Sequence, residues 1–386
     1  MWKDFKVLDA DAHMQEPFDL WSDFMEPEYY DRRPIVNDYE NKQFFHYDPC
    51  ELFPDGTGRG GKGGDRGRRP PKVTERNRQK YGDAYDATWT AESRLKDMDR
   101  YGWDKMVLIP GTGAGPLRVE GKDQGLMWAV TRAYNNWSLD FASADPKRLK
   151  MVVALPNQHD IEGVLTEVRR CVDRGGVTIQ MPMAMTGKQW HDPDYDPFWN
   201  LAVELDCPVS FHGVPSGRPH SSARHGDGGG VIVALDHAVG FPFENMISMG
   251  HLIYTGLLER FPDLKVSFLE GSAGWLPFWL GRLDDHAVPG HRQEVFFDAP
   301  TMALKPSEYF YRQGFVACDG DESALSAAVE LCGDNHIVWN TDYPHADAPD
   351  PEKAIPSLVN QPISEEAKRK ILWDNPARLY GKRGSD

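Results

Sequence analysis

Eight short apolar segments rich in strand-forming residues recur along this chain, and most are separated by segments with the apolar periodicity of a helix. The expected strands are 6–11, 105–109, 150–155, 177–181, 208–211, 265–269, 314–318 and 336–340. The expected helices are 91–101, 122–144, 161–174, 197–205, 244–260 and 323–331. Strand–helix alternation repeated eight times predicts an α/β fold of the (β/α)8 TIM-barrel type, with parallel strands inside and helices outside.

The length of 386 residues is enough for one such barrel with insertions, so we expect residues 1–386 to form a single domain. A doubly wound open sheet is the competing architecture, because it has the same alternation of strands and helices. Its dinucleotide-binding form is disfavoured, since no Gly-x-Gly-x-x-Gly follows the first strand.

The segment 18–90 interrupts the alternation of strands and helices, because it separates the first strand from its first helix. It contains a stretch rich in glycine and arginine, residues 56–71, whose composition alone fits a flexible, solvated loop. A long insertion after a barrel strand lies at the face where active sites are built. We therefore expect 18–90 to form a lid or an oligomerisation segment.

Composition excludes several classes of protein. A net charge of −16 argues against nucleic acid as a partner. No apolar run approaches the ~20 residues that span a bilayer, and the N-terminus has no apolar signal-peptide core. The five cysteines are scattered and form no Cys-x-x-Cys, which fits a reducing compartment, and we expect a cytoplasmic protein.

Ionisable side chains stand where several predicted strands end, the layer of a barrel in which active sites lie. These residues are Asp11 and His13 with Glu16 one turn further on, then His212, Glu270, Asp342 and His345. Burying several carboxylates and imidazoles close together costs free energy unless a cation lies among them. Both groups bind Zn, Mn and Fe. The strand ends therefore predict a metal site. A metal-free binding barrel is the alternative, and it would be expected to lose these side chains.

Three motifs resemble those of the amidohydrolase-related enzymes, in the branch that contains aminocarboxymuconate-semialdehyde decarboxylase. They are Asp-Ala-Asp-Ala-His-Met-Gln-Glu-Pro at 9–17, Leu-Leu-Glu-Arg-Phe-Pro-Asp-Leu-Lys-Val at 257–266 and Asn-Thr-Asp-Tyr-Pro-His at 340–345. The resemblance implies a metal-dependent barrel whose ligands are Asp11, His13, His212 and Asp342. It also implies oligomerisation, because members of this family commonly form dimers.

The chain departs from the family pattern in ways that add carboxylates. Asp11 stands where the family often has histidine, and Glu270 stands where its decarboxylases usually have histidine. Gln180 ends the fourth strand, so no lysine is available there to bridge two metals as a carbamate. Spare carboxylates such as Glu16 and Glu270 can bridge two metal ions ~3.5–4 Å apart.

The carboxylate-rich pattern resembles a small group of dinuclear non-heme monooxygenases within this superfamily. We therefore favour an enzyme with two ions, Fe/Fe or Fe/Mn, that uses O2 to hydroxylate a small organic substrate. The source of its electrons stays open, and an electron-donor protein is one candidate, since the chain has no ferredoxin or flavin motif. The alternative is a Zn- or Mn-dependent hydrolase or non-oxidative decarboxylase of a small carboxylic acid, with Glu270 or His345 as the general acid or base.

Overall fold

A closed ring of eight parallel strands forms the centre of the molecule in the computed structural model. The structure describes residues 2–36, 47, 50–53, 71–119, 123–157, 160–182, 188–212, 230–287 and 302–386. Hydrogen-bonded neighbours follow the order β1-β2-β3-β4-β5-β6-β7-β8, and each pair is parallel. The strands are β1 Leu8–His13, β2 Lys105–Ile109, β3 Leu149–Ala154, β4 Thr178–Gln180, β5 Val209–His212, β6 Val266–Leu269, β7 Gly314–Asp319 and β8 Ile337–Asn340.

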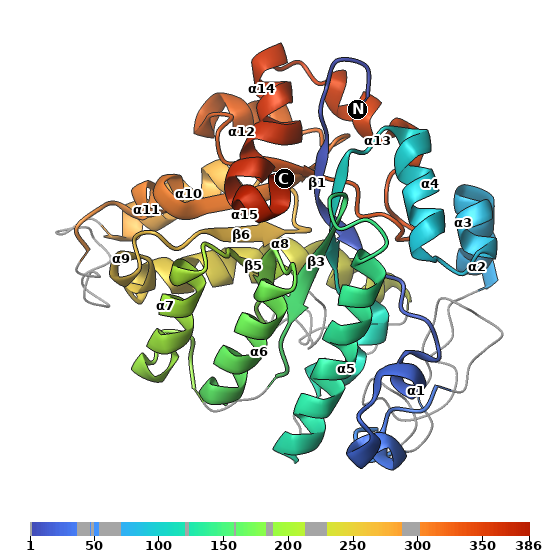
Figure 1. Ribbon diagram of the computed structural model, residues 1–386. Coiled ribbons are helices and arrows are strands. Elements are labelled where there is room, and N and C mark those ends of the chain that lie inside the picture. Colours follow the sequence, from blue (N-terminus) through green and yellow to red (C-terminus); the bar gives the residue numbers. More distant parts are fainter. Residues whose placement is uncertain are drawn as a thin grey trace.

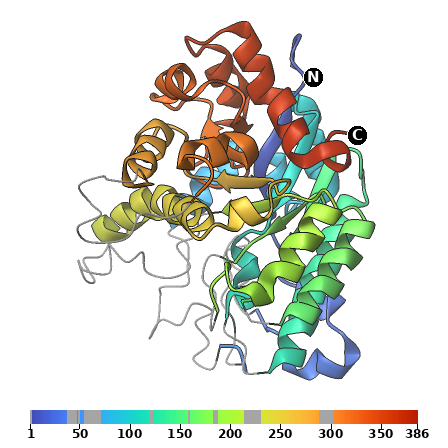
Figure 2. The ribbon, with the colours of Figure 1, turned by 90° about the vertical axis from the view of Figure 1, so that its left-hand side faces the viewer.

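Helices surround this ring (Figure 1). Within the described ranges they are α1 Leu20–Phe24, α2 Pro71–Tyr81, α3 Asp83–Asp86, α4 Ala91–Tyr101, α5 Gln124–Ala142, α6 Ile161–Asp173, α7 Asp196–Glu204, α8 Gly230–Tyr254, α9 Leu257–Arg260, α10 Leu276–Ala287, α11 Pro306–Gln313, α12 Leu325–Cys332, α13 Pro351–Val359, α14 Glu365–Arg369 and α15 Asn375–Ser385. None of these helices is long and apolar enough to cross a membrane. The two ends of the chain lie near each other in both views (Figures 1 and 2).

The barrel closes where β1 meets the segment that follows β8. The backbone N–H of His13 donates to the Tyr343 carbonyl at 2.7 Å, and the N–H of Asp342 donates to the Asp11 carbonyl at 3.1 Å. These bonds join the first strand to the last, so the predicted (β/α)8 TIM barrel is confirmed. They also place the functional groups of β1 beside those that follow β8.

Local sequence explains where the elements begin and end. The Thr90 hydroxyl caps α4 by accepting from the Ser93 N–H, and Gly102, which follows the helix, is left-handed with φ 82°, a conformation that glycine adopts at low cost. The helix therefore has the bounds that its periodicity predicts. Helix α8 differs, because it begins at Gly230 rather than near residue 244. It contains Pro242 and is apolar on most sides, so a single-face periodicity does not reveal its first half.

The insertion 18–90 contributes α1, α2 and α3 to the described part of the chain, whereas the Gly/Arg-rich residues 56–70 lie outside it. Helix α2 holds the loop that follows β8. Lys80 donates to the carbonyls of His345 and Ala348, and the Tyr81 hydroxyl donates to the His345 carbonyl. The insertion thus contacts the end of the barrel where the sequence predicts the site.

Candidate metal centre

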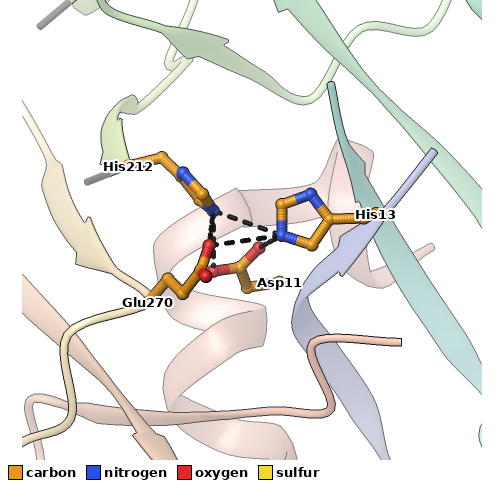
Figure 3. A group of neighbouring side chains, drawn as sticks. All are labelled: Asp11, His13, His212 and Glu270. Atoms are coloured by element: carbon orange, nitrogen blue, oxygen red, sulfur yellow. Dashed lines mark hydrogen bonds and ion pairs between the residues drawn. The ribbon is translucent and has the colours of Figure 1, made fainter. Parts of the chain in front are cut away.

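Side chains from four strand ends of the barrel converge on one point, and Figure 3 shows those of Asp11, His13, His212 and Glu270. Two overlapping groups have ligand atoms that all lie within 4.8 Å of one another: Asp11, His13, His212 and Glu270 form the first, and His13, Glu270, Asp342 and His345 form the second. Strand β1 supplies Asp11 and His13, whereas the others stand at or just beyond the ends of β5, β6 and β8. The structure therefore brings together six of the seven residues singled out from the sequence.

The shortest distances link imidazole nitrogens to carboxylate oxygens. His212 Nε2 lies 2.6 Å from Glu270 Oε2 and 3.7 Å from Asp11 Oδ2. His13 Nε2 lies 3.2 Å from Asp342 Oδ1 and 3.5 Å from both Asp11 Oδ1 and Glu270 Oε2. The two Nε2 atoms are 3.2 Å apart. Nitrogens and oxygens that face one point in this way can share a single cation.

Several of these atoms are buried and have no hydrogen-bond partner among the described residues. They include both oxygens of Asp11 and Nε2 of His345. A buried acceptor without a partner costs about 1–3 kcal/mol, and more when it is charged. A divalent cation would satisfy the oxygens together, so the donor set fits a metal ion.

The backbone is strained where two of these carboxylates stand. Glu270 has φ 49° and Asp342 has φ 54°, in the left-handed region that non-glycine residues rarely adopt. Each such residue costs of order 1–3 kcal/mol and is typical of functional sites. Gly271 follows Glu270 with its α-carbon against Asn245, since an added Cβ would lie 2.5 Å from the Asn245 side-chain nitrogen. This packing leads the chain sharply away from β6.

Burial and neighbouring charged groups shift the pKa values of the side chains in the cluster. Burial raises the pKa of Asp11 well above its usual range, and Glu270 and Asp342 raise it further against the opposing effect of His13. Burial alone would lower the pKa of His13, but the carboxylates of Asp342 and Glu270 outweigh it and raise that pKa. Without a cation, the cluster therefore retains protons that a metal ion would displace.

Residues beneath the cluster fix the positions of its strands. The Asp9 carboxylate accepts from the Thr341 hydroxyl at 2.5 Å and from the backbone N–H groups of Asp11 and Thr341, both at 3.1 Å. A register shift lies between Asp9 and Ala12, so simple alternation along β1 does not hold. Asp9 therefore ties β1 to β8 instead of entering the cluster.

A buried arginine supports the same two strands. Arg94 donates to the His13 carbonyl at 2.7 Å, and its guanidinium lies over the Tyr343 ring, 4.5 Å from the centroid. The Tyr343 hydroxyl in turn donates to Asp97 at 2.5 Å. The sequence analysis did not identify Arg94, because no motif marks a residue whose contacts come from a distant strand.

Glu16 does not join the cluster, which corrects the expectation that it stands with the metal ligands. Its carboxylate accepts from the N–H groups of Gly111 and Gly113, at 2.7 and 3.0 Å, and from the Tyr134 hydroxyl at 2.8 Å. The hydrogen bonds of the Glu16 carboxylate thus hold the loop after β2. Glu16 is therefore close to His13 in sequence, but its carboxylate does not lie in the metal cluster.

A cavity of about 560 Å³ opens beside the cluster. Glu270 and Asp342 form part of its wall, with residues from α2, α8, the end of β7 and the segment after β8. Its ionisable lining residues are Arg76, His237, Glu270, Asp319, Asp321, Asp342, Asp347, Asp350 and Lys353. Arg76 and Asp319 are not among the residues predicted from the sequence. Asp319 could have been found by the rule used for the other strand ends, since it is the last residue of β7.

Comparisons with known proteins show the family and the fold to which the chain is similar. A model of the amidohydrolase family matches residues 9–382. The 2-amino-3-carboxymuconate-6-semialdehyde decarboxylase of Dictyostelium discoideum is 26% identical over 297 residues, which cover 76% of this chain and 77% of that protein.

Two solved structures share the fold. An amidohydrolase from Mycobacterium avium subsp. paratuberculosis K-10 has a TM-score of 0.73 and 20% identity, over 98% of this chain and 100% of that chain. A dihydroxybenzoic acid decarboxylase from Polaromonas sp. JS666, with bound manganese and the inhibitor 2-nitroresorcinol, has a TM-score of 0.63 and 24% identity, over 81% of this chain and 90% of that chain.

Proposed function

This chain belongs to the amidohydrolase family, in the branch related to aminocarboxymuconate-semialdehyde decarboxylase, and we propose that it is a metal-dependent, non-oxidative decarboxylase of a small carboxylic acid. The observation that carries the proposal is the buried convergence of carboxylate oxygens and imidazole nitrogens at the wall of a cavity. The names of the two decarboxylases supply the reaction class.

The names of the relatives support a non-oxidative decarboxylase, which was the alternative in the sequence-based prediction. They do not support the monooxygenase, which was the preferred prediction. Their names support neither iron nor O2 nor an electron-donor protein, and one of them holds manganese. Glu270 and Asp11, which suggested an oxygenase, are also suitable ligands for manganese, because Mn²⁺ accepts carboxylate and imidazole in one site. An excess of carboxylates therefore does not by itself imply two ions or oxygen chemistry.

We assign one divalent ion to Asp11, His13, His212, Glu270 and Asp342. The two overlapping groups of ligand atoms share His13 and Glu270, and the single lone pair of His13 Nε2 can serve only one ion. These five side chains would hold the ion, and a substrate oxygen would complete its ligands. When bound, the ion supplies Lewis-acid polarisation of that oxygen.

Arg76 is the cavity residue best suited to an anionic substrate. It lies on α2, lines the cavity and is exposed. A guanidinium can bind a carboxylate through two parallel hydrogen bonds, which fixes its orientation. The substrate carboxylate would thus be held between Arg76 and the cluster.

His345 is the proton carrier in this proposal. Its Nδ1 lies 2.7 Å from Asp342 Oδ1, and its ring stacks on His13 with centroids 4.0 Å apart. These contacts orient the ring and leave Nε2 without a partner among the described residues. As the bond to the carboxylate breaks and CO2 leaves, the electron pair remains on the substrate carbon, and that carbon takes the proton from His345 Nε2.

The test is an assay without oxygen. Protein stripped with chelator and reloaded with Mn²⁺ is incubated anaerobically with 2,6-dihydroxybenzoate and related hydroxylated or amino-substituted aromatic acids, and CO2 and the decarboxylated product are measured. In D2O, the product should carry one deuterium at the carbon that lost CO2. His345→Gln should lower the rate at least 100-fold, about the contribution of a positioned acid, and retain Mn²⁺. A product that forms only with O2 would contradict the proposal.

A further inference from the structure

Asp319 is one of four cavity carboxylates among the described residues that the metal cluster does not use. It ends β7, between the strands that carry Glu270 and Asp342, and it lines the same cavity as they do. Side chains at the carboxyl ends of barrel strands face the active site. Asp319 therefore stands on the functional face, next to the proposed ligands and outside their group.

The contacts of Asp319 hold its carboxylate in place and leave it able to accept more bonds. Its Oδ1 accepts from Asn340 at 3.0 Å and its Oδ2 accepts from Ser272 at 3.3 Å. Each carboxylate oxygen has two lone pairs, so each can accept a further hydrogen bond. The structure thus presents fixed, unfilled acceptor sites in the wall of the cavity.

Both donors stand two residues from a proposed metal ligand. Ser272 follows Glu270, and it is itself left-handed, with φ 58°. Asn340 precedes Asp342 and is buried, at 3% exposure. The strand ends that position the ligands therefore also position Asp319. The location of its carboxylate is thus fixed relative to the metal site.

The other cavity carboxylates outside the cluster are paired or exposed. Asp347 pairs with His237 at 3.2 Å and Asp350 pairs with Lys353 at 2.7 Å, whereas Asp321 is exposed. Asp319 is bonded only to neutral donors among the described residues, and burial raises its pKa to about 6, so it is mostly ionised at neutral pH. A half-buried carboxylate without a cation prefers a ligand that donates a hydrogen bond to it.

We propose that Asp319 is a specificity-determining residue, which accepts a hydrogen bond from a hydroxyl or amino substituent of the substrate whose carboxylate lies at the metal cluster. This inference rests on the proposed function and narrows it to carboxylic acids that bear such a donor. A site built to bond a hydroxyl discriminates against the analogue that lacks it, because that analogue displaces water from the carboxylate without replacing its hydrogen bond.

The test measures discrimination between ligands, so it does not depend on turnover. Dissociation constants of the Mn²⁺-loaded protein are determined by calorimetry for benzoate, 4-hydroxybenzoate, 2,6-dihydroxybenzoate and 3-aminobenzoate. We expect the wild type to bind at least one donor-bearing acid about tenfold or more tightly than benzoate, the scale of a hydrogen bond to a charged group. In Asp319→Asn this preference should fall below about threefold.

Asp321→Asn is the matched control, since it makes the same charge change on the same cavity wall two residues away. It should retain the wild-type preference, and both variants should bind Mn²⁺ with wild-type affinity. A wild type without preference, or an Asp319→Asn protein that keeps it, would overturn the inference. So would a tenfold loss of Mn²⁺ affinity in Asp319→Asn, which would make Asp319 part of the metal site. The anaerobic CO2 assay of the wild type decides the proposed function separately.

Discussion

The Nε2 atoms of His13 and His212 face each other at 3.2 Å, on strands that are far apart in sequence and on different sides of the barrel centre. The carboxylates of Asp11 and Glu270 approach both of them (Figure 3). A proton shared between the two imidazoles satisfies only one pair of atoms, whereas a divalent cation satisfies all four residues. The arrangement therefore makes metal binding the first property to test.

His212→Ala removes one nitrogen from this set and should weaken Mn²⁺ binding by more than about 100-fold, since even the loss of a residue that only orients a ligand costs 10–100-fold. Mn²⁺ should also raise the melting temperature of the wild type, because it binds only the folded state, and the variant should lose that increase. The measurements are equilibrium dialysis and thermal unfolding. His251→Ala, whose ring contacts His191 and Trp190 outside the cluster, is the control and should bind Mn²⁺ normally.

Most of the fold could be predicted from the sequence, because each barrel strand is a continuous apolar run between helical segments. The strand ends also located the cluster, since parallel strands bring their carboxyl ends to one face. What failed depends on contacts between distant segments. Glu16 lies one turn past His13, but its carboxylate accepts hydrogen bonds from the loop after β2. Local periodicity gives no sign of this contact.

Asp319 illustrates a different limit. Site residues were predicted from the ionisable side chains at the ends of the expected strands. Asp319 was not among them, because the expected strand ended at Cys318, one residue before the end of β7. An error of one residue, which is ordinary for element boundaries, hides a site residue completely. Arg94 and the α2 residues could not be found by any such rule, because their partners His13 and His345 come from other parts of the chain.

Glu322 should make stability depend on pH. Its carboxylate accepts from the N–H groups of Ala273 and Gly274, and burial raises its pKa from 4.5 to about 7. The raised pKa means that the folded state binds the proton more tightly than the unfolded state does. The stability that this provides is present below pH 4.5 and is lost as the pH rises through about 7.

Glu322→Gln cannot ionise, so its melting temperature relative to the wild type should increase steadily as the pH rises from about 4.5 to about 8. Any hydrogen bond lost on substitution adds an offset that does not change with pH. Glu330→Gln, an exposed glutamate on α12, should show no such trend. A difference between Glu322→Gln and the wild type that is constant with pH would contradict the prediction.

Tyr343→Phe should destabilise the fold without removing the metal. The Tyr343 hydroxyl donates to Asp97, which is 7% exposed, so the substitution leaves a buried carboxylate with one partner fewer. The expected loss is about 1–3 kcal/mol in the free energy of unfolding, measured by urea denaturation. Tyr30→Phe, at the surface, should change it by less than about 0.5 kcal/mol. Mn²⁺ affinity should stay within threefold of wild type, and a larger loss would show that Tyr343 acts mainly through the cluster.

Tyr81→Phe tests whether the insertion positions the proposed proton carrier. The Tyr81 hydroxyl holds the His345 carbonyl from α2, at 2.5 Å, and Lys80 reaches the same carbonyl at 3.4 Å. Without the hydroxyl, the loop after β8 should be less firmly held, and small displacements of a reacting group can lower rates by up to about 100-fold. We expect kcat to fall at least tenfold while Mn²⁺ affinity is unchanged, because His345 is not among the proposed ligands. Tyr85→Phe on the neighbouring α3, whose ring packs against Trp89, should leave kcat unchanged. If Tyr81→Phe also keeps the wild-type kcat, the insertion does not position His345 through this bond.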